Sequence, residues 1–113
     1  MDMKFEQNSK SNVAIVLSSY PLEHSLDDFL KFFVEQKLIA CASVIPECTS
    51  LFSWNSGVQN EKEQLILMKT LKNKLKVLEA LWVEKHPYEV PEFLIISTNK
   101  VNESYGRWIE EIL

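Results

Sequence analysis

The sequence predicts an α+β protein, a ferredoxin-like sandwich in which two helices cover one face of a four-stranded, mostly antiparallel sheet. Three observations predict this fold. Short apolar runs alternate with segments of helical periodicity in the order βαββαβ, and a further amphipathic segment follows at the C-terminus. A hairpin signal joins the two central strands. The first, third and fourth strands are apolar at nearly every position, so both faces of the sheet are expected to be covered.

The first strand is predicted over 13–17, an apolar run that ends at a turn-forming Ser-Ser-Tyr-Pro sequence. A helix is expected over about 26–37, because apolar residues recur there at helical spacing. Ser25 is the expected N-cap of this helix, and Asp28 stands in the position of a capping box.

The second strand is expected to begin at 39–45 and to resume over 51–54. Proline cannot donate to a sheet ladder, so Pro46 predicts a bulge, a bend or an edge between the two parts. The sequence Asn-Ser-Gly at 55–57 is typical of a tight hairpin turn. The third strand, over 64–69, then returns beside the second.

A second helix is predicted after the third strand, with Thr70 as its cap. His86 is expected to end it, because the residue before a proline disfavours the helical conformation. The apolar stripe of this helix is Leu71, Leu75, Leu78 and Trp82. The fourth strand is predicted over 93–98, and Asn102 is expected to cap a short last helix. The residues expected to face inward from it are Tyr105, Trp108, Ile109 and Ile112.

The chain has 113 residues, which predicts a single domain at 12–113 after a flexible, polar tail at 1–11. Apolar residues make up 46% and charged residues 25%, proportions typical of a globular protein. No apolar run approaches the roughly 20 residues of a membrane span, so no membrane partner is expected. Two cysteines without a CxxC pair indicate a reducing, cytoplasmic location.

Charge and glycine content argue against two functional classes. Twelve basic and sixteen acidic residues give a net charge of −4, whereas nucleic-acid-binding proteins usually carry a basic surplus, so no nucleic-acid partner is expected. The only glycines are Gly57 and Gly106, which excludes a glycine-rich phosphate loop. No organic cofactor is expected.

The sheet face opposite the helices needs a cover. The first, third and fourth predicted strands do not alternate apolar with polar residues, as strands with one wet face do. A chain of this length has no second layer to place there. We therefore predict an obligate homo-oligomer in which sheets pack on sheets.

The segment 86–92, His-Pro-Tyr-Glu-Val-Pro-Glu, gathers an imidazole, a phenol and carboxylates. His86 is a candidate metal ligand or proton-transfer group, because imidazole binds transition metals and titrates near neutral pH. The plainer interpretation is a rigid helix-to-strand turn whose polar groups cap backbone ends. A single histidine does not make a metal site, so the residues alone favour the turn.

Three residues elsewhere are further candidates. Cys41 lies between alanines in a strand and is most simply a buried, inert thiol. Lys69 ends an apolar strand, so its ammonium is expected to need an anionic partner. Trp54 precedes the hairpin turn, where an exposed aromatic side chain favours a subunit contact over a ligand platform. The sequence has no Ser-His-Asp set, HExxH motif or zinc-ligand spacing.

Several short motifs occur in an order that resembles one known family. They are Ala40-Cys41-Ala42, Ile45-Pro46, Ser53-Trp54 before the Gly57 turn, Glu63, Lys69-Thr70, the segment 86–92, and Tyr105 with Trp108. From about residue 12 to its C-terminus, the chain resembles the CutA divalent-cation-tolerance proteins. The His-Pro-Tyr-Glu-x-Pro-Glu string and the Lys-Thr pair make the resemblance specific.

The resemblance implies a ferredoxin-like fold assembled as a tight homotrimer, similar in plan to PII-type signalling proteins. It also implies a response to metal ions, with weak binding of copper or another divalent transition metal and His86 as the candidate ligand. The family's residue cluster corresponds here to Cys41, Trp54, Glu63, Lys69, His86, Tyr88 and Glu92, which are expected near an intersubunit cleft. Some bacterial members carry a cysteine and a second histidine where this chain has Ser18 and Lys85, so only His86 remains of that copper set.

Three functions compete. The first is a cytosolic homotrimer that binds divalent metal, which requires that His86 is not buried with both ring nitrogens hydrogen-bonded. The second is a PII-like sensor or scaffold that binds a small anion through Lys69, or a protein partner. The third is an enzyme with His86 as acid–base, and with Glu63 or Glu92 and Lys69 as electrophilic partners. The enzyme ranks last, so no enzymatic activity is predicted.

Overall fold

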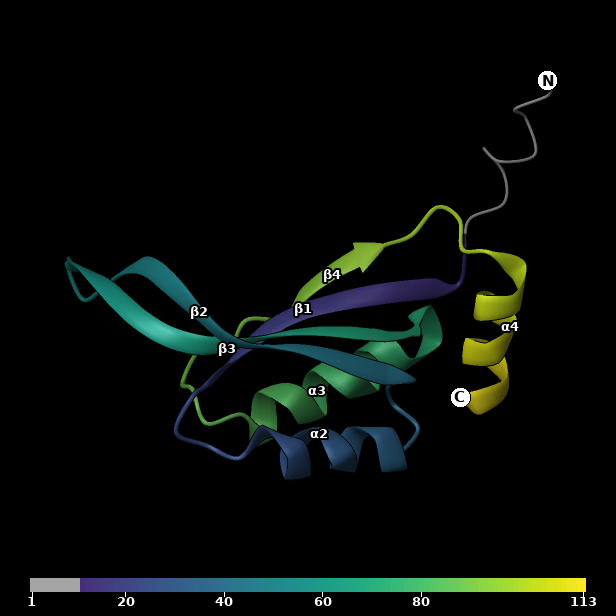
Figure 1. The fold of residues 1–113 in the computed structure, drawn as a ribbon, viewed down its shortest axis with the longest axis horizontal. Helices are drawn as coiled ribbons and strands as arrows, with labels where there is room; N and C mark the ends of the chain where they lie inside the picture. Colours follow the sequence, from purple (N-terminus) through teal and green to yellow (C-terminus); the bar gives the residue numbers. More distant parts are fainter. Residues whose placement is uncertain (1–10) are drawn as a thin grey trace, which may run out of the picture.

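The computed structural model describes residues 11–113, which form one sheet and three helices (Figure 1). The strands are β1 (Val13–Pro21), β2 (Cys41–Trp54), β3 (Gly57–Leu71) and β4 (Leu94–Ser97), and the helices are α2 (Leu26–Glu35), α3 (Leu75–Lys85) and α4 (Glu103–Ile112). The sheet order is β2-β3-β1-β4, with every neighbouring pair antiparallel. Helices α2 and α3 lie on one face, and α4 lies at the end remote from the β2–β3 turn (Figure 1). This is the predicted ferredoxin-like α+β fold with an added C-terminal helix.

The predicted flexible tail at 1–11 falls, apart from its last residue, outside the described residues. The amide of Ser11 donates to the carbonyl of Asn99 over 3.2 Å, and its hydroxyl accepts the amide of Val13 over 2.9 Å. Ser11 therefore belongs to the folded domain.

The core lies between the sheet and the two covering helices. Val16 of β1 is opposite Met68 of β3, and neither side chain is accessible to solvent. The largest fully buried side chains are Trp82 of α3 and Phe33 of α2, whose ring centroids are 5.1 Å apart. The same cluster includes Tyr20, Leu26, Leu30, Leu38, Ile39, Ile66 and Leu78. Burial of a large apolar side chain contributes about 1.5–3 kcal/mol, so this layer supplies much of the stability.

The hairpin turn between β2 and β3 is confirmed as a two-residue connection. Trp54 pairs with Gly57, and the two residues between them, Asn55 and Ser56, have φ angles of 51° and 66°. Positive φ at both central positions matches the twist of the flanking strands. The left-handed conformation therefore falls on Asn55 and Ser56, while Gly57 has an ordinary φ and begins the next strand.

Pro46 marks a β-bulge, one of the outcomes that the sequence predicts. Ile45 is opposite Leu65, but the next pair is Cys48 with Glu63, so two residues of β2 face one residue of β3. Because side chains alternate along a strand, the extra residue reverses which face each later residue of β2 occupies. Trp54 consequently lies on the same side of the sheet as Ile45.

The boundaries of β1, β3 and α3 differ most from the prediction. β1 continues to Pro21, and β3 begins at Gly57 rather than at residue 64. Thr70 does not cap a helix, because it lies within β3 and its buried hydroxyl donates to the carbonyl of Leu38 over 2.6 Å. Helix α3 begins at Leu75, after a single 3-10 turn over 72–74.

The helix caps agree with the prediction in position but not in bonding. Ser25 and Asn102 precede α2 and α4 in the extended conformation, and neither side chain makes a capping hydrogen bond, so the expected capping box does not form. In α4 only Ile109 is buried, where it packs with Val13, Ala40 and Leu71. The other residues expected to face inward are exposed: Tyr105, Trp108 and Ile112.

Candidate functional site

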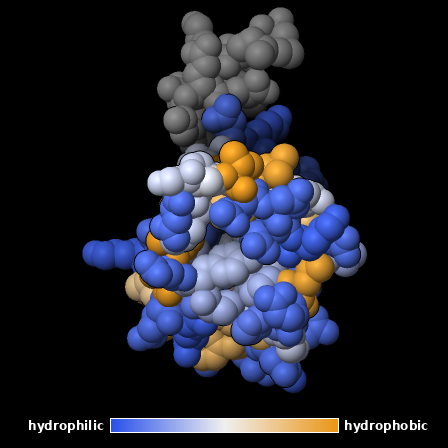
Figure 2. Space-filling model, turned by 90° about the vertical axis from the view of Figure 1, so that its left-hand side faces the viewer, coloured by the Kyte–Doolittle hydropathy of each residue, from blue (hydrophilic) through white to orange (hydrophobic). Residues whose placement is uncertain are grey.

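The sheet carries an uncovered apolar surface on the side away from α2 and α3. Its residues alternate with the core positions of the same strands, and we call them the open face: Ile15, Leu17, Ile45, Leu65, Leu67, Leu94 and Ile96. Ile45, Leu94 and Ile96 are 53%, 51% and 47% exposed. Helix α4 covers only the end of this side, through Ile109. In Figure 2, which views the hairpin end, hydrophobic surface gathers near the top, the side on which β4 lies in Figure 1.

His86 lies at the end of α3 and is buried, with 6% of its surface exposed. Its Nε2 is 2.7 Å from the carbonyl oxygen of Ser19, and its Nδ1 accepts the amide of Tyr88 over 3.0 Å. A carbonyl can only accept and an amide can only donate, so Nε2 carries the proton and the ring is neutral. Burial also lowers the pKa of this imidazole, which disfavours its charged form.

This arrangement argues against His86 as a metal ligand. Metal coordination needs a free lone pair on a ring nitrogen, and the only lone pair of the neutral ring is on Nδ1, where it accepts the Tyr88 amide. Across 11–113, no group of three or more His, Cys, Asp or Glu side chains is placed to hold a metal ion. His86 therefore serves as a structural hydrogen-bonding group in this chain.

Two carboxylates and a phenol meet beside this histidine. The hydroxyl of Tyr88 donates to Oε2 of Glu63 over 2.6 Å, and Glu63 is itself buried. Burial and this bond to a carboxylate raise the pKa of the Tyr88 phenol. Burial, followed by the negative charge of Glu63, raises the pKa of the Glu92 carboxyl, and a hydrogen bond from Ser19 acts in the opposite direction. Glu92, whose carboxyl pKa is raised, thus lies close to Glu63, which is buried and accepts the Tyr88 hydroxyl.

Ser18 connects this group to the core, a link that the sequence analysis missed. Its hydroxyl donates to the carbonyl of Glu92 over 2.6 Å and accepts the indole N–H of Trp82 over 3.0 Å. The sequence feature that could have revealed this link is the pair Ser18-Ser19 directly after the apolar run 13–17. Polar side chains that become buried need hydrogen-bond partners.

A second polar group lies on β2 and β3, where Cys41 is opposite Lys69. The ammonium of Lys69 donates to the hydroxyl of Ser43 over 3.0 Å, and no carboxylate within the described residues forms an ion pair with it. The expected anionic partner is thus replaced by a hydroxyl. The sulfur of Cys41 is 3.7 Å from the hydroxyl of Tyr105 on α4, and this cysteine is half-buried rather than a core thiol.

The predicted residue cluster is therefore split within one chain. Glu63, Tyr88 and Glu92 come together, whereas Lys69 is six positions along β3 from Glu63, about 20 Å in an extended strand. Trp54 lies at the hairpin tip and is 42% exposed, as expected for a contact residue. A single cleft that contains all of these residues requires more than one chain.

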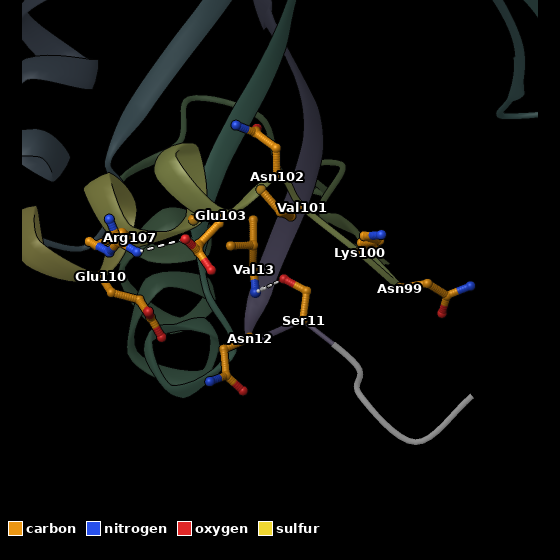
Figure 3. Close-up of a pocket in the computed structure, with 11 residues that line it drawn as sticks. Ser11, Asn12, Val13, Asn99, Lys100, Val101, Asn102, Glu103, Arg107 and Glu110 are labelled. Atoms are coloured by element: carbon orange, nitrogen blue, oxygen red, sulfur yellow. Dashed lines mark hydrogen bonds and ion pairs between the residues drawn. The ribbon is translucent and has the colours of Figure 1, made fainter. Parts of the chain in front are cut away.

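A separate pocket of about 480 Å³ lies at the beginning of α4 (Figure 3). Ser11, Asn99 and Asn102 border it, and Arg107 forms an ion pair with Glu103 over 3.0 Å at its rim. None of the predicted site residues lines this pocket.

The fold and the group of Glu63, Tyr88 and Glu92, of which Glu63 is buried, define a class, that of ferredoxin-like α+β proteins with a polar site between the sheet and the α3–β4 connection. The family model described as CutA1 divalent ion tolerance protein matches residues 14–112. The chain belongs to the CutA1 divalent ion tolerance family. This membership favours a role in divalent-cation tolerance over the sensor or scaffold alternative, but the condition that the first hypothesis placed on His86 is not met.

Relatives with known names support the same membership. The chain is 33% identical over 109 residues to a divalent-cation tolerance protein CutA of Escherichia coli, a match that covers 96% of each protein. The crystal structure of CutA1 from Pyrococcus horikoshii superposes with a TM-score of 0.82 at 29% identity, covering 88% of this chain and 96% of that one. For CutA of Synechococcus elongatus the TM-score is 0.85 at 25% identity, with 92% and 93% covered. None of the helices within 11–113 is long and apolar enough to cross a membrane.

Proposed function

We propose that this chain acts as a cytosolic homotrimer in the tolerance of divalent cations. Family membership supports the role, since its E. coli relatives carry the name divalent-cation tolerance protein. The observation that carries the assembly is the open face, a strongly apolar sheet surface that this chain leaves without a cover. The proposal assigns no enzymatic activity, organic cofactor, nucleic-acid partner or membrane partner.

The β2–β3 hairpin supports assembly independently. β1 pairs with β3 only as far as Glu63, so the strands beyond that point form a two-stranded arm with no third strand. Two-stranded hairpins are marginally stable in water, and this one exposes Phe52 and Trp54. In a trimer, the arm gains a neighbouring chain to pack against, which also brings Trp54 to another chain's residues.

Light scattering on the purified, tag-free chain tests the assembly. We expect a mass three times the chain mass of 13.2 kDa, persisting on dilution to the low micromolar range, because apolar sheet-on-sheet interfaces are typical of obligate oligomers. A mass of one chain at those concentrations would contradict the proposal, and so would a dimer.

We further propose that the chain binds copper or another divalent transition metal weakly, through its thiols. Cys41 and Cys48 are both free and half-buried, and thiolates are preferred ligands of copper and zinc. The described residues provide no set of three ligands within one chain, which is why weak binding is expected. His86 is not part of this proposal, since its ring nitrogens are already hydrogen-bonded.

Calorimetric titration of the reduced, metal-stripped protein with Zn²⁺, and with Cu²⁺ under anaerobic conditions, tests metal binding. We expect saturable binding that the double variant Cys41→Ser/Cys48→Ser loses. The matched variant His86→Gln is expected to bind as the wild type does. Binding that survives the double variant but disappears in His86→Gln would refute the assignment to the thiols.

A further inference from the structure

The segment 87–93, which connects α3 to β4, is held in place by side chains. Among the described residues, no hydrogen bond between main-chain groups anchors it. Its amides and carbonyls belong to neither a helix nor a strand, and Pro87 and Pro91 lack an amide hydrogen altogether. The position of this segment on the sheet therefore depends on a few specific bonds.

Side-chain bonds make the attachment, and one of them joins Ser19 to the Glu92 carboxyl. The amide of Tyr88 donates to Nδ1 of His86 over 3.0 Å, and the Tyr88 hydroxyl donates to Glu63 over 2.6 Å. Further along, the carbonyl of Glu92 accepts the hydroxyl of Ser18 over 2.6 Å. The ring of His86 is itself fixed to β1, because its Nε2–H donates to Ser19 over 2.7 Å. His86 thus joins the first residues of the segment to the sheet.

We propose that His86 is an acid-sensitive latch, which holds the start of the segment 87–93 against β1 while its ring is neutral and releases the Tyr88 amide when its ring takes up a proton. A proton from solvent binds Nδ1 and converts the acceptor of the Tyr88 amide into a donor. Two N–H groups then face each other, and the bond between them is lost. The Nε2–H bond to Ser19 persists, so the ring stays on β1 while the Tyr88 amide loses its acceptor.

The groups around the ring set its resistance to protonation. Burial has the largest effect and lowers the pKa of His86, and the nearby His24 acts in the same direction. The negative charge of Glu63 acts in the opposite direction, as does the bond to a main-chain carbonyl. The rings of Tyr20 and Tyr88 also face the imidazole, with centroids 5.2 Å and 4.9 Å away. Burial raises the pKa of both phenols, so they stay neutral throughout the relevant range.

The direction of the pH effect follows from these influences. A released His86 titrates near its ordinary pKa of about 6.5, above that of the latched ring, so acid favours the released form. One linked proton raises the ratio of released to latched molecules by up to about tenfold per pH unit below that value. Glu92 acts in the opposite sense at lower pH, because its carboxyl pKa is raised in the latched form. The effect of His86 is therefore isolated best between about pH 7.5 and 5.5.

Hydrogen exchange on the full chain tests the latch, with rates expressed as protection factors to remove the intrinsic pH dependence of exchange. In the wild type, the protection factor of the Tyr88 amide is expected to fall by up to about fivefold between pH 6.5 and 5.5. His24→Gln, which removes the exposed histidine, is expected to show the same fall. His86→Gln is expected to abolish it, because glutamine offers a neutral acceptor and donor that do not titrate. A flat wild-type profile, or an equal fall in His86→Gln, would overturn the proposal.

The ring nitrogen chemical shifts of His86 in the wild type give a second measurement that does not depend on how well a variant folds. The latch requires a neutral ring with its proton on Nε2 at pH 7, and a loss of Tyr88 amide protection that follows the protonation of Nδ1. A ring that is charged at pH 7, or one that protonates without any loss of protection, would refute it.

Discussion

Replacement of Ile96 by glutamate on the open face is expected to convert the trimer into single chains. Ile96 lies on β4 and is 47% exposed in one chain, so its replacement removes little from the core of that chain. In an assembly that covers the open face, the same carboxylate would be buried against apolar side chains. Burial of an unpaired ion costs several kcal/mol, and a symmetric trimer would incur that cost in every chain. Light scattering is expected to show the mass of one chain.

Val77→Glu is the matched control for this experiment. Val77 is a β-branched residue of α3 and is 53% exposed on the side of the molecule away from the open face. Its replacement introduces the same charge and is expected to leave the trimer mass unchanged. Circular dichroism separates dissociation from unfolding in both variants. If Ile96→Glu remains a trimer of wild-type stability, the open face is not the assembly surface.

Replacement of Trp82 by alanine is expected to have the largest effect on the folding of the chain. The Trp82 side chain is inaccessible to solvent and packs against the rings of Phe29 and Phe33, with centroids 4.9 Å and 5.1 Å away. Removal of such a side chain typically costs about 3–5 kcal/mol, a large share of the roughly 5–15 kcal/mol that stabilises a domain. The indole N–H that binds Ser18 is lost as well. Denaturant unfolding should show a markedly lower midpoint.

The variant Trp82→Phe separates the contribution of ring packing from that of the hydrogen bond to Ser18. Phenylalanine keeps an aromatic ring in the cluster but cannot donate to Ser18, so a loss of about 1–2 kcal/mol is expected. Both variants must be compared with the wild type at one protein concentration, because assembly contributes to apparent stability. Equal losses in the two variants would show that the hydrogen bond, and not the packing of the indole, dominates.

The sequence predicted element order well and element length poorly, for physical reasons. Apolar periodicity marks what is buried, and it located every strand and helix of the fold. The first half of β3 is largely polar from Gln59 to Lys62, so periodicity missed it, and only its pairing with β2 makes it a strand. Thr70 has the local preference of a cap residue, but its pairing with Ala14 across the sheet overrides that preference.

The sequence predicted which residues belong to the candidate site, but not how they are arranged in space. The sequence singled out Glu63, Tyr88 and Glu92, and the structure brings these together. It could not show that both nitrogens of His86 are engaged, since one partner, Ser19, is far away along the chain. The separation of Glu63 from Lys69 was predictable in principle, because two residues on one extended strand cannot approach each other.

The bulge at Pro46 has a consequence for how this protein tolerates changes in chain length. Deletion of one residue at 46–47 would restore regular pairing with β3, with every remaining residue type unchanged. The side chains of Phe52 and Trp54 would stay on the side of Ile45, because eight positions instead of nine would then separate Trp54 from Ile45. A single-residue deletion should therefore be tolerated better at this point than elsewhere in β2, where it would break the regular pairing with β3.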